Sequence, residues 1–137
     1  MKSDIISKLS NKGFRMTQAR QTIVNLLDNS DHPMTARSIH KTLIKIGSKV
    51  NITTVYRELD FLLSQNIIIK VPLLDNELHY EINSGEHHHH LLCQSCGQIQ
   101  NLVLNSEKKL LEEAHSFSGF EIKRHSLAFF GTCQNCN

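Results

Sequence analysis

Apolar residues in the first half of the chain recur with the three-to-four-residue spacing of helices that bury one face. The spacing predicts four helices, over residues 4–12, 18–28, 36 to about 46, and 52–64. Thr17, Thr35 and Asn51 stand where the last three helices would begin, and their side chains are good N-caps. Gly13 and Gly47 stand where the first and third helices would end. We therefore expect a series of short helices up to about residue 64.

The helix predicted over residues 52–64 has two chemically different faces. At 100° per residue, its apolar face contains Ile52, Val55, Leu59, Leu62 and Leu63. The opposite face carries Thr53, Thr54 and Arg57, with Tyr56 near the boundary. A helix with this outer face, preceded by a helix and a turn, is typical of a DNA recognition helix. An ordinary amphipathic helix has the same spacing, so the next segment has to decide between the two interpretations.

Residues 67–71 and 78–82 predict two short strands around a loop at 72–77. Helices followed by a hairpin are the order of a winged helix, which favours the DNA-binding interpretation. Residues 83–85 have the composition of a linker, so we place a boundary there, between domains 1–83 and 84–137. In the second domain we expect strands at 87–93, 98–103 and near 121–130, and a helix from Asn105 or Ser106 to about residue 117. The expected fold class is α+β.

All four cysteines of the 137-residue chain lie in two C-x-x-C pairs, Cys93 with Cys96 and Cys133 with Cys136. The chain has no apolar run of about 18 residues and no signal peptide at its start, so we expect a cytoplasmic protein that does not enter a membrane. In that compartment paired cysteines indicate a metal more often than a disulfide. The spacing predicts a four-thiolate structural zinc site. Zinc would clip together a domain of about 55 residues, near the size at which a metal or a partner subunit is needed.

Four consecutive histidines precede the first cysteine pair. On a strand, successive side chains point to opposite faces, so His88 and His90 would project one way, and His87 and His89 the other. One run can therefore supply two separate metal sites. The alternatives are a solvent-exposed polar strand without metal and an internal affinity tag, but a tag does not explain the cysteines that follow. Other possible ligands, each by itself more typical of a surface residue, are His32, Glu81 and His125.

Charge is distributed unevenly along the chain, although the formal net charge is only +2. Residues 1–57 hold ten Lys or Arg against three Asp or Glu, a balance of +7, and residues 58–137 hold five against ten, a balance of −5. A basic first half suggests a polyanionic partner, with nucleic acid as the leading candidate.

These residues together resemble the ferric uptake regulator (Fur) family of bacterial metal-sensing repressors. The matching pieces are residues 13–20, 53–57, 79–81, 87–90 with the first cysteine pair, and 125–127 ahead of the second pair. They occur in the family's order over nearly the whole chain. The resemblance implies an N-terminal winged-helix DNA-binding domain and a small C-terminal dimerisation domain. It also implies a homodimer that binds double-stranded operator DNA when loaded with metal, and a protein that is not an enzyme.

The resemblance also assigns roles to residues. The structural zinc ligands are Cys93, Cys96, Cys133 and Cys136, and the sensing-site ligands are His32, Glu81, His88 and His90. A further metal site takes His87, His89 and His125. The residues that match positions in contact with DNA are Arg15, for the minor groove, and Thr53, Thr54, Tyr56 and Arg57.

Three residues depart from the family's pattern. His89 stands where the family often has Asp, which makes the further metal site richer in nitrogen. Asn101 stands where a carboxylate is common. The sensing site is therefore expected to lack this carboxylate as a fifth ligand. Lys108 stands where Glu is common, and Glu107 is the nearest substitute, one residue out of register. Glu107 therefore completes the set of ligands expected for the further site.

Ligand type alone does not choose the sensed metal, because three imidazoles and a carboxylate suit Zn²⁺, Fe²⁺, Mn²⁺ and Ni²⁺. The zinc-sensing branch of the family commonly adds a cysteine ligand, and no cysteine remains outside the two pairs. The peroxide-sensing branch relies on aspartates, and Glu81 with Asn101 argues against membership of that branch. We therefore favour Fe²⁺ as the sensed metal, with Zn²⁺ or Mn²⁺ as the alternatives. The alternative function is that of a zinc uptake regulator of the same family.

Two other classes of function use similar residues. A zinc hydrolase would hold a catalytic ion with His88 and His90, but it needs a general base that no motif supplies. A metal-buffering protein would not need a winged helix.

Overall fold

The computed structural model describes residues 2–73 and 76–137, so the middle of the loop predicted at 72–77 lies outside the described residues. The chain divides into two compact units, Met1–Gly85 and Glu86–Asn137. The boundary predicted from composition lies two residues before this division. Among the described residues, no helix is both long and apolar enough to cross a membrane.

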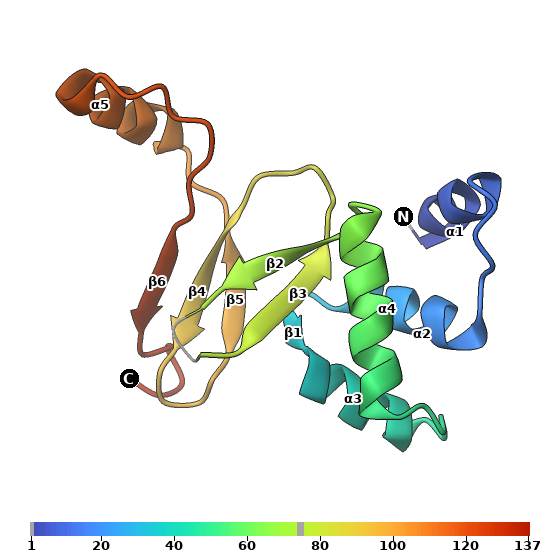
Figure 1. Ribbon diagram of the computed structural model, residues 1–137. Helices are drawn as coiled ribbons and strands as arrows, with labels where there is room; N and C mark the ends of the chain where they lie inside the picture. The colour runs from blue at the N-terminus through green and yellow to red at the C-terminus, as the bar shows by residue number, and fades with distance from the viewer. Residues whose placement is uncertain (1, 74–75) are drawn as a thin grey trace. The chain divides into compact units, whose positions relative to one another are not determined.

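The first unit combines four helices with a small antiparallel sheet (Figure 1). Its elements are α1 (Lys2–Asn11), α2 (Gln18–Asn29), β1 (Met34–Thr35), α3 (Ala36–Lys45), α4 (Ile52–Ser64), β2 (Ile68–Pro72) and β3 (Leu78–Ile82). The strands are ordered β1-β3-β2, and β3 pairs antiparallel with both neighbours. Strand β1 was not predicted, because two residues are too short to carry a period.

The helix starts follow directly from the sequence. The side chains of Thr17, Thr35 and Asn51 each accept a hydrogen bond from the backbone N–H three residues further on. Each cap satisfies a backbone donor that the helix itself leaves unpaired, and such a cap contributes about 1 kcal/mol. The predicted start of each of these three helices is therefore confirmed.

A single apolar core holds the first unit together. Its fully buried side chains come from all four helices and from β2, and they include Leu9, Ile23, Ile39, Leu43, Val55, Leu59, Leu62 and Ile68. On α4 the buried residues are Val55, Leu59 and Leu62, while Tyr56 and Arg57 are exposed. The core thus fixes which face of α4 points outward.

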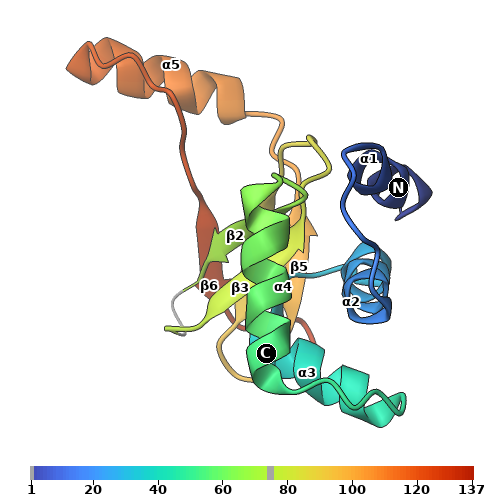
Figure 2. The ribbon, with the colours of Figure 1, turned by 45° about the vertical axis from the view of Figure 1, so that its right-hand side comes forward.

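The second unit contains one short sheet and one helix. Its elements are β4 (His89–Cys93), β5 (Ile99–Leu102), α5 (Glu107–Ser118) and β6 (Ala128–Gly131). Strand β4 is central, antiparallel to β5 and parallel to β6. Figures 1 and 2 both show α5 beyond the end of this sheet rather than across its face. No residue of α5 is buried within the chain.

Two strand predictions in this unit were too long. The strand predicted over 87–93 begins only at His89, and the strand predicted near 121–130 covers only Ala128–Gly131. Strand β6 pairs with β4 over four residues, from Ala128 to Gly131. Residues 119–127 do not extend this ladder.

Apolar burial in the second unit is small. Cys93 is its single buried apolar residue, and the other buried side chains are those of His89 and His90. Large apolar side chains are exposed instead, with Phe117 94% exposed, Phe120 74% and Val103 72%. An apolar core of the kind seen in the first unit is therefore missing from this unit as a single chain.

Substitution of Leu59 by Ala should lower the free energy of unfolding of the first unit by about 2–5 kcal/mol, because it leaves a cavity in the core. Ile46→Ala is the matched control, because Ile46 is 64% exposed, and we expect its effect to be within about 0.5 kcal/mol. Urea titrations followed by circular dichroism measure both values. Equal losses for the two variants would contradict the packing described for α4.

Candidate metal centres

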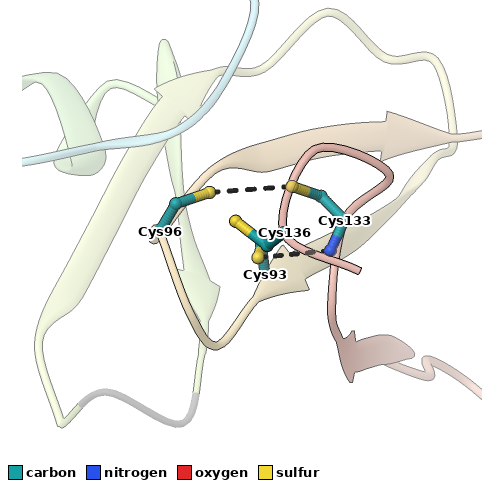
Figure 3. Close-up of side chains that lie close together, drawn as sticks. All are labelled: Cys93, Cys96, Cys133 and Cys136. Atoms are coloured by element: carbon teal, nitrogen blue, oxygen red, sulfur yellow. Dashed lines mark hydrogen bonds between the residues drawn. The ribbon is translucent and has the colours of Figure 1, made fainter.

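The four cysteine thiols converge at one end of the second unit (Figure 3). Parallel pairing sets Cys93, at the end of β4, opposite Gly131, at the end of β6, so the two C-x-x-C turns lie side by side. The sulfur atoms of Cys96 and Cys133 are 3.8 Å apart, and all four sulfurs lie within 4.8 Å of one another. Tetrahedral zinc with Zn–S bonds of about 2.3 Å requires sulfurs about 3.8 Å apart. The donor set and the spacing therefore fit zinc, and all four cysteines are free thiols.

Backbone groups prepare this cluster for a cation. The N–H of Cys133 donates to the sulfur of Cys93 over 3.2 Å. This hydrogen bond, together with those from the N–H groups of Cys96 and Ser95, lowers the pKa of Cys93 to about 6. Contacts with the side chains of Cys133 and Cys96 raise the pKa of Cys136 to about 12. The thiol of Cys93 is thus readily ionised while that of Cys136 keeps its proton, and a bound metal would take the place of that proton.

A second cluster joins His87, His89, Glu107 and His125, whose ligand atoms also lie within 4.8 Å of one another. The Oε1 atom of Glu107 is 2.5 Å from Nε2 of His87 and 3.1 Å from Nε2 of His89, and it contacts Nε2 of His125. The Nε2 atoms of His87 and His125 are 3.0 Å apart. Three imidazoles and one carboxylate thus face a common point, a donor set that suits Zn²⁺, Fe²⁺ or Mn²⁺.

Glu107 is the first residue of α5, and this position explains its role. Its side chain is 19% exposed and turned toward the histidines, whereas the side chain of Lys108 is 89% exposed. Burial opposes ionisation of Glu107, but the hydrogen bond with His125 and the charges of His87 and His89 outweigh it and lower the pKa of the carboxyl. An ionised carboxylate supplies the negative charge that a divalent cation needs.

The histidine side chains alternate along the run, although the strand itself begins at His89. The rings of His87 and His89 are 4.7 Å apart, and those of His88 and His90 are 5.0 Å apart. His90 is buried and is paired with Asn101 of the neighbouring strand β5, so the two side chains share one face of the sheet. The Asn101 amide is therefore placed to offer a neutral oxygen near His90.

The other two residues expected in the sensing site belong to the first unit. Glu81 lies in β3 and is half-buried. Continuing the β1–β3 register by one residue sets Pro33 opposite Glu81, next to His32. Nδ1 of His32 lies 3.1 Å from the carbonyl oxygen of Pro33. If Nδ1 carries the proton and donates it to this oxygen, Nε2 is left as the atom that can bind a metal.

The residues expected to contact DNA are presented by two segments of the first unit. Thr53, Tyr56 and Arg57 are exposed on α4. Thr54 is half-buried, and its N–H donates to the side chain of Asn51 over 2.8 Å. Arg15 is exposed in the connector between α1 and α2.

The sequence pattern indicates no role for Arg20, which is hydrogen-bonded to Glu58. The two residues are 38 positions apart, so no local spacing could have indicated this pair.

Comparison with known proteins identifies the family. The family model "Ferric uptake regulator family" matches residues 11–130. The ferric uptake regulation protein of Legionella pneumophila is 28% identical over 134 residues, which cover 94% of this chain and 96% of that protein. The ferric uptake regulator of Francisella tularensis, solved with iron, has 34% identity and a TM-score of 0.80, covering 90% of this chain and 95% of that one. A zinc-bound manganese uptake regulator has 27% identity and a TM-score of 0.78, covering 90% and 94%. The chain therefore belongs to the ferric uptake regulator family, as its motifs predicted.

Proposed function

We propose that this protein is a transcriptional repressor that binds operator DNA as a metal-loaded homodimer and responds to Fe²⁺. The observation that carries the proposal is the run His87–His90, whose side chains alternate between two faces and which precedes the four-cysteine cluster in the sequence. Members of this family are metal-responsive, DNA-binding regulators and not enzymes, so the hydrolase alternative loses its support. A repressor of this kind would act in the cytoplasm, where bacterial DNA is found.

The first unit supports the DNA-binding part of the proposal. We interpret α3, the turn after it and α4 as a helix-turn-helix, with the β2–β3 hairpin as the wing. Tyr56 and Arg57 project from α4 away from the core, so they can reach base edges or phosphates. The excess of basic residues over positions 1–57 would attract the phosphate backbone.

The sensing site would take His32 and Glu81 from the first unit and His88 and His90 from the second. The metal supplies a positive charge that all four side chains can bind. A metal bound in this way would link the two units and so restrict movement at the hinge, residues 83–85. A restricted hinge sets the separation of two recognition helices in a dimer, and that separation must match half-sites about one helical turn apart, or a multiple of it. A ligand that prefers one state by about 10⁴-fold moves a two-state equilibrium from about 1% to about 99%.

The second unit buries little apolar surface within one chain. We therefore expect a structural zinc ion and a second copy of the chain to stabilise it. The four cysteines would hold Zn²⁺, which contributes about 10 kcal/mol or more to folding in such sites. The exposed side chains of Phe117, Phe120 and Val103 would be covered by a second copy of the chain. The cluster of His87, His89, Glu107 and His125 would hold a further metal within this dimerisation domain.

The choice of Fe²⁺ over Zn²⁺ or Mn²⁺ rests on two observations. The sensing residues offer nitrogen and oxygen ligands only, and a regulator 34% identical to this chain was solved with iron. The comparison with a zinc-bound manganese uptake regulator keeps Zn²⁺ and Mn²⁺ as the alternatives.

Substituting Ala for Tyr56 or Arg57 should weaken operator binding by about 10- to 100-fold, because each loses a base or phosphate contact, and should leave metal affinity unchanged. Fluorescence anisotropy with DNA selected from a random pool by the unaltered protein measures the first quantity, and calorimetry with metal measures the second. Arg124→Ala is the matched control for the Arg57 variant, because it also removes one positive charge but does so in the second unit. Unchanged DNA binding by both α4 variants would contradict the proposed recognition helix.

DNA binding should depend on free metal, and His90→Ala should raise the metal activity needed by at least about 10-fold, because it removes a ligand. Anisotropy titrations across Fe²⁺, Zn²⁺, Mn²⁺ and Ni²⁺ at buffered free activity test this expectation. His115→Ala, which alters a histidine outside the clusters, is the control. Activation by zinc at far lower activity than iron would overturn the choice of Fe²⁺.

Substituting Ser for Cys96 should remove about one equivalent of tightly bound zinc and unfold the second unit, while the first unit keeps its own apolar core. Elemental analysis measures the zinc, and residue-resolved NMR follows the two units separately. Ser95→Ala, in the same turn, should change neither signal. Full zinc content in the Cys96→Ser variant would show that the thiols do not form the site.

A further inference from the structure

One arginine side chain joins three separate segments of the first unit. From α2, Nε of Arg20 donates to Oε2 of Glu58 over 2.7 Å, and Nη2 donates to Oε1 of the same carboxylate over 3.3 Å. Nη1 donates to the backbone carbonyl of Arg15 over 2.7 Å. The guanidinium carbon lies 3.7 Å from the centre of the Phe61 ring. One planar group thus contacts the α1–α2 connector and two positions on α4.

The position of this group favours a precise geometry. The side chains of Arg20 and Glu58 are each only 13% exposed. A guanidinium can bind a carboxylate with two parallel hydrogen bonds and stack on an aromatic ring at the same time, which an ammonium group cannot do. Phe14 also packs edge-on against Phe61, with ring centres 5.0 Å apart. The connector and α4 are therefore held together by both polar and aromatic contacts.

The connector has few backbone contacts of its own. Residues 14–17 are in neither helix nor strand. The carbonyl of Arg15 accepts from Arg20, and the carbonyl of Met16 accepts from the side chain of Gln21 over 3.2 Å. The direction in which the Arg15 side chain leaves the backbone thus depends on the first turn of α2.

We propose that Arg20 is a positioning residue for DNA binding, which holds the connector that carries Arg15 at a fixed place relative to α4. The inference rests on the proposed function and on the minor-groove contact that the family resemblance implies for Arg15, made while Tyr56 and Arg57 contact base edges or phosphates. Two contacts made at once require a fixed separation between the segments that carry them. Arg20 sets this separation through Glu58, which follows Arg57 directly, and through the carbonyl of Arg15.

A charge-neutralising substitution on α4 separates this role from simple electrostatics. Glu58→Gln removes a negative charge from a DNA-binding surface, so charge alone predicts tighter DNA binding. The positioning role predicts binding about 5- to 10-fold weaker, because the amide cannot hold the guanidinium through two charged hydrogen bonds. Asp60→Asn removes the same charge from an exposed position on the same helix, and it should bind DNA as the unaltered protein does, or slightly more tightly.

A double-mutant cycle shows through which residue Arg20 acts. Arg20→Met should weaken DNA binding by about 10-fold or more and should lower the salt dependence, the slope of log K against log salt, by about one unit, as Arg15→Ala does. Added to Arg15→Ala, it should weaken binding by a smaller factor than it does alone, because the two changes remove the same contact. Arg20→Lys should not restore the affinity. Anisotropy with the metal-loaded, full-length protein at several salt concentrations measures all of these values.

The outcomes separate this inference from the proposed function. Urea titrations identify any variant that fails to fold, and in that event Glu58→Gln with its Asp60→Asn control still decides. Glu58→Gln binding as tightly as Asp60→Asn, or fully multiplicative effects of Arg20→Met and Arg15→Ala, would overturn the positioning role. If the unaltered, metal-loaded protein selects no DNA, the proposed function itself fails.

Discussion

Strand β4 pairs in parallel with β6, from His90 opposite Ala128 to Cys93 opposite Gly131. Because the strands run the same way, their carboxyl ends lie together, and these ends carry the two cysteine pairs. Their amino ends also lie together, and there His125, three residues before β6, meets His87 and His89. One ladder of four residue pairs therefore assembles a thiol cluster at one end and an imidazole cluster at the other.

This arrangement explains why the two units differ in what stabilises them. The first unit buries apolar side chains from four helices, and its helix starts are capped by its own side chains. The second unit buries little besides Cys93, His89 and His90. A cation bound by either cluster would add order to this unit, because a metal that binds only the folded site stabilises the folded state.

The sequence was sufficient where local chemistry decides the structure. Caps such as Asn51, the helical spacing of α4 and the two C-x-x-C pairs are all short-range signals, and the structure has each of them in place. It was insufficient where the outcome depends on a distant neighbour. Residues 121–127 were predicted to belong to the last strand, but they do not extend the pairing with β4.

Two side chains in the functional regions show the same limit. Glu107 faces the histidines instead of Lys108, because α5 begins at Glu107 and turns that side chain inward. Helix boundaries are the least certain part of any pattern analysis. The contact between Arg20 and Glu58 joins residues that only the packing of α2 against α4 brings together.

The alternation of the histidines makes the length of this segment as important as its composition. An inserted or deleted residue between His87 and Cys93 would send each side chain on one side of the change to the opposite face of the sheet. The nitrogens of one cluster would then point toward the other, even though every histidine was still present. A substitution of one ligand should therefore be tolerated more easily here than a change in the number of residues between the ligands.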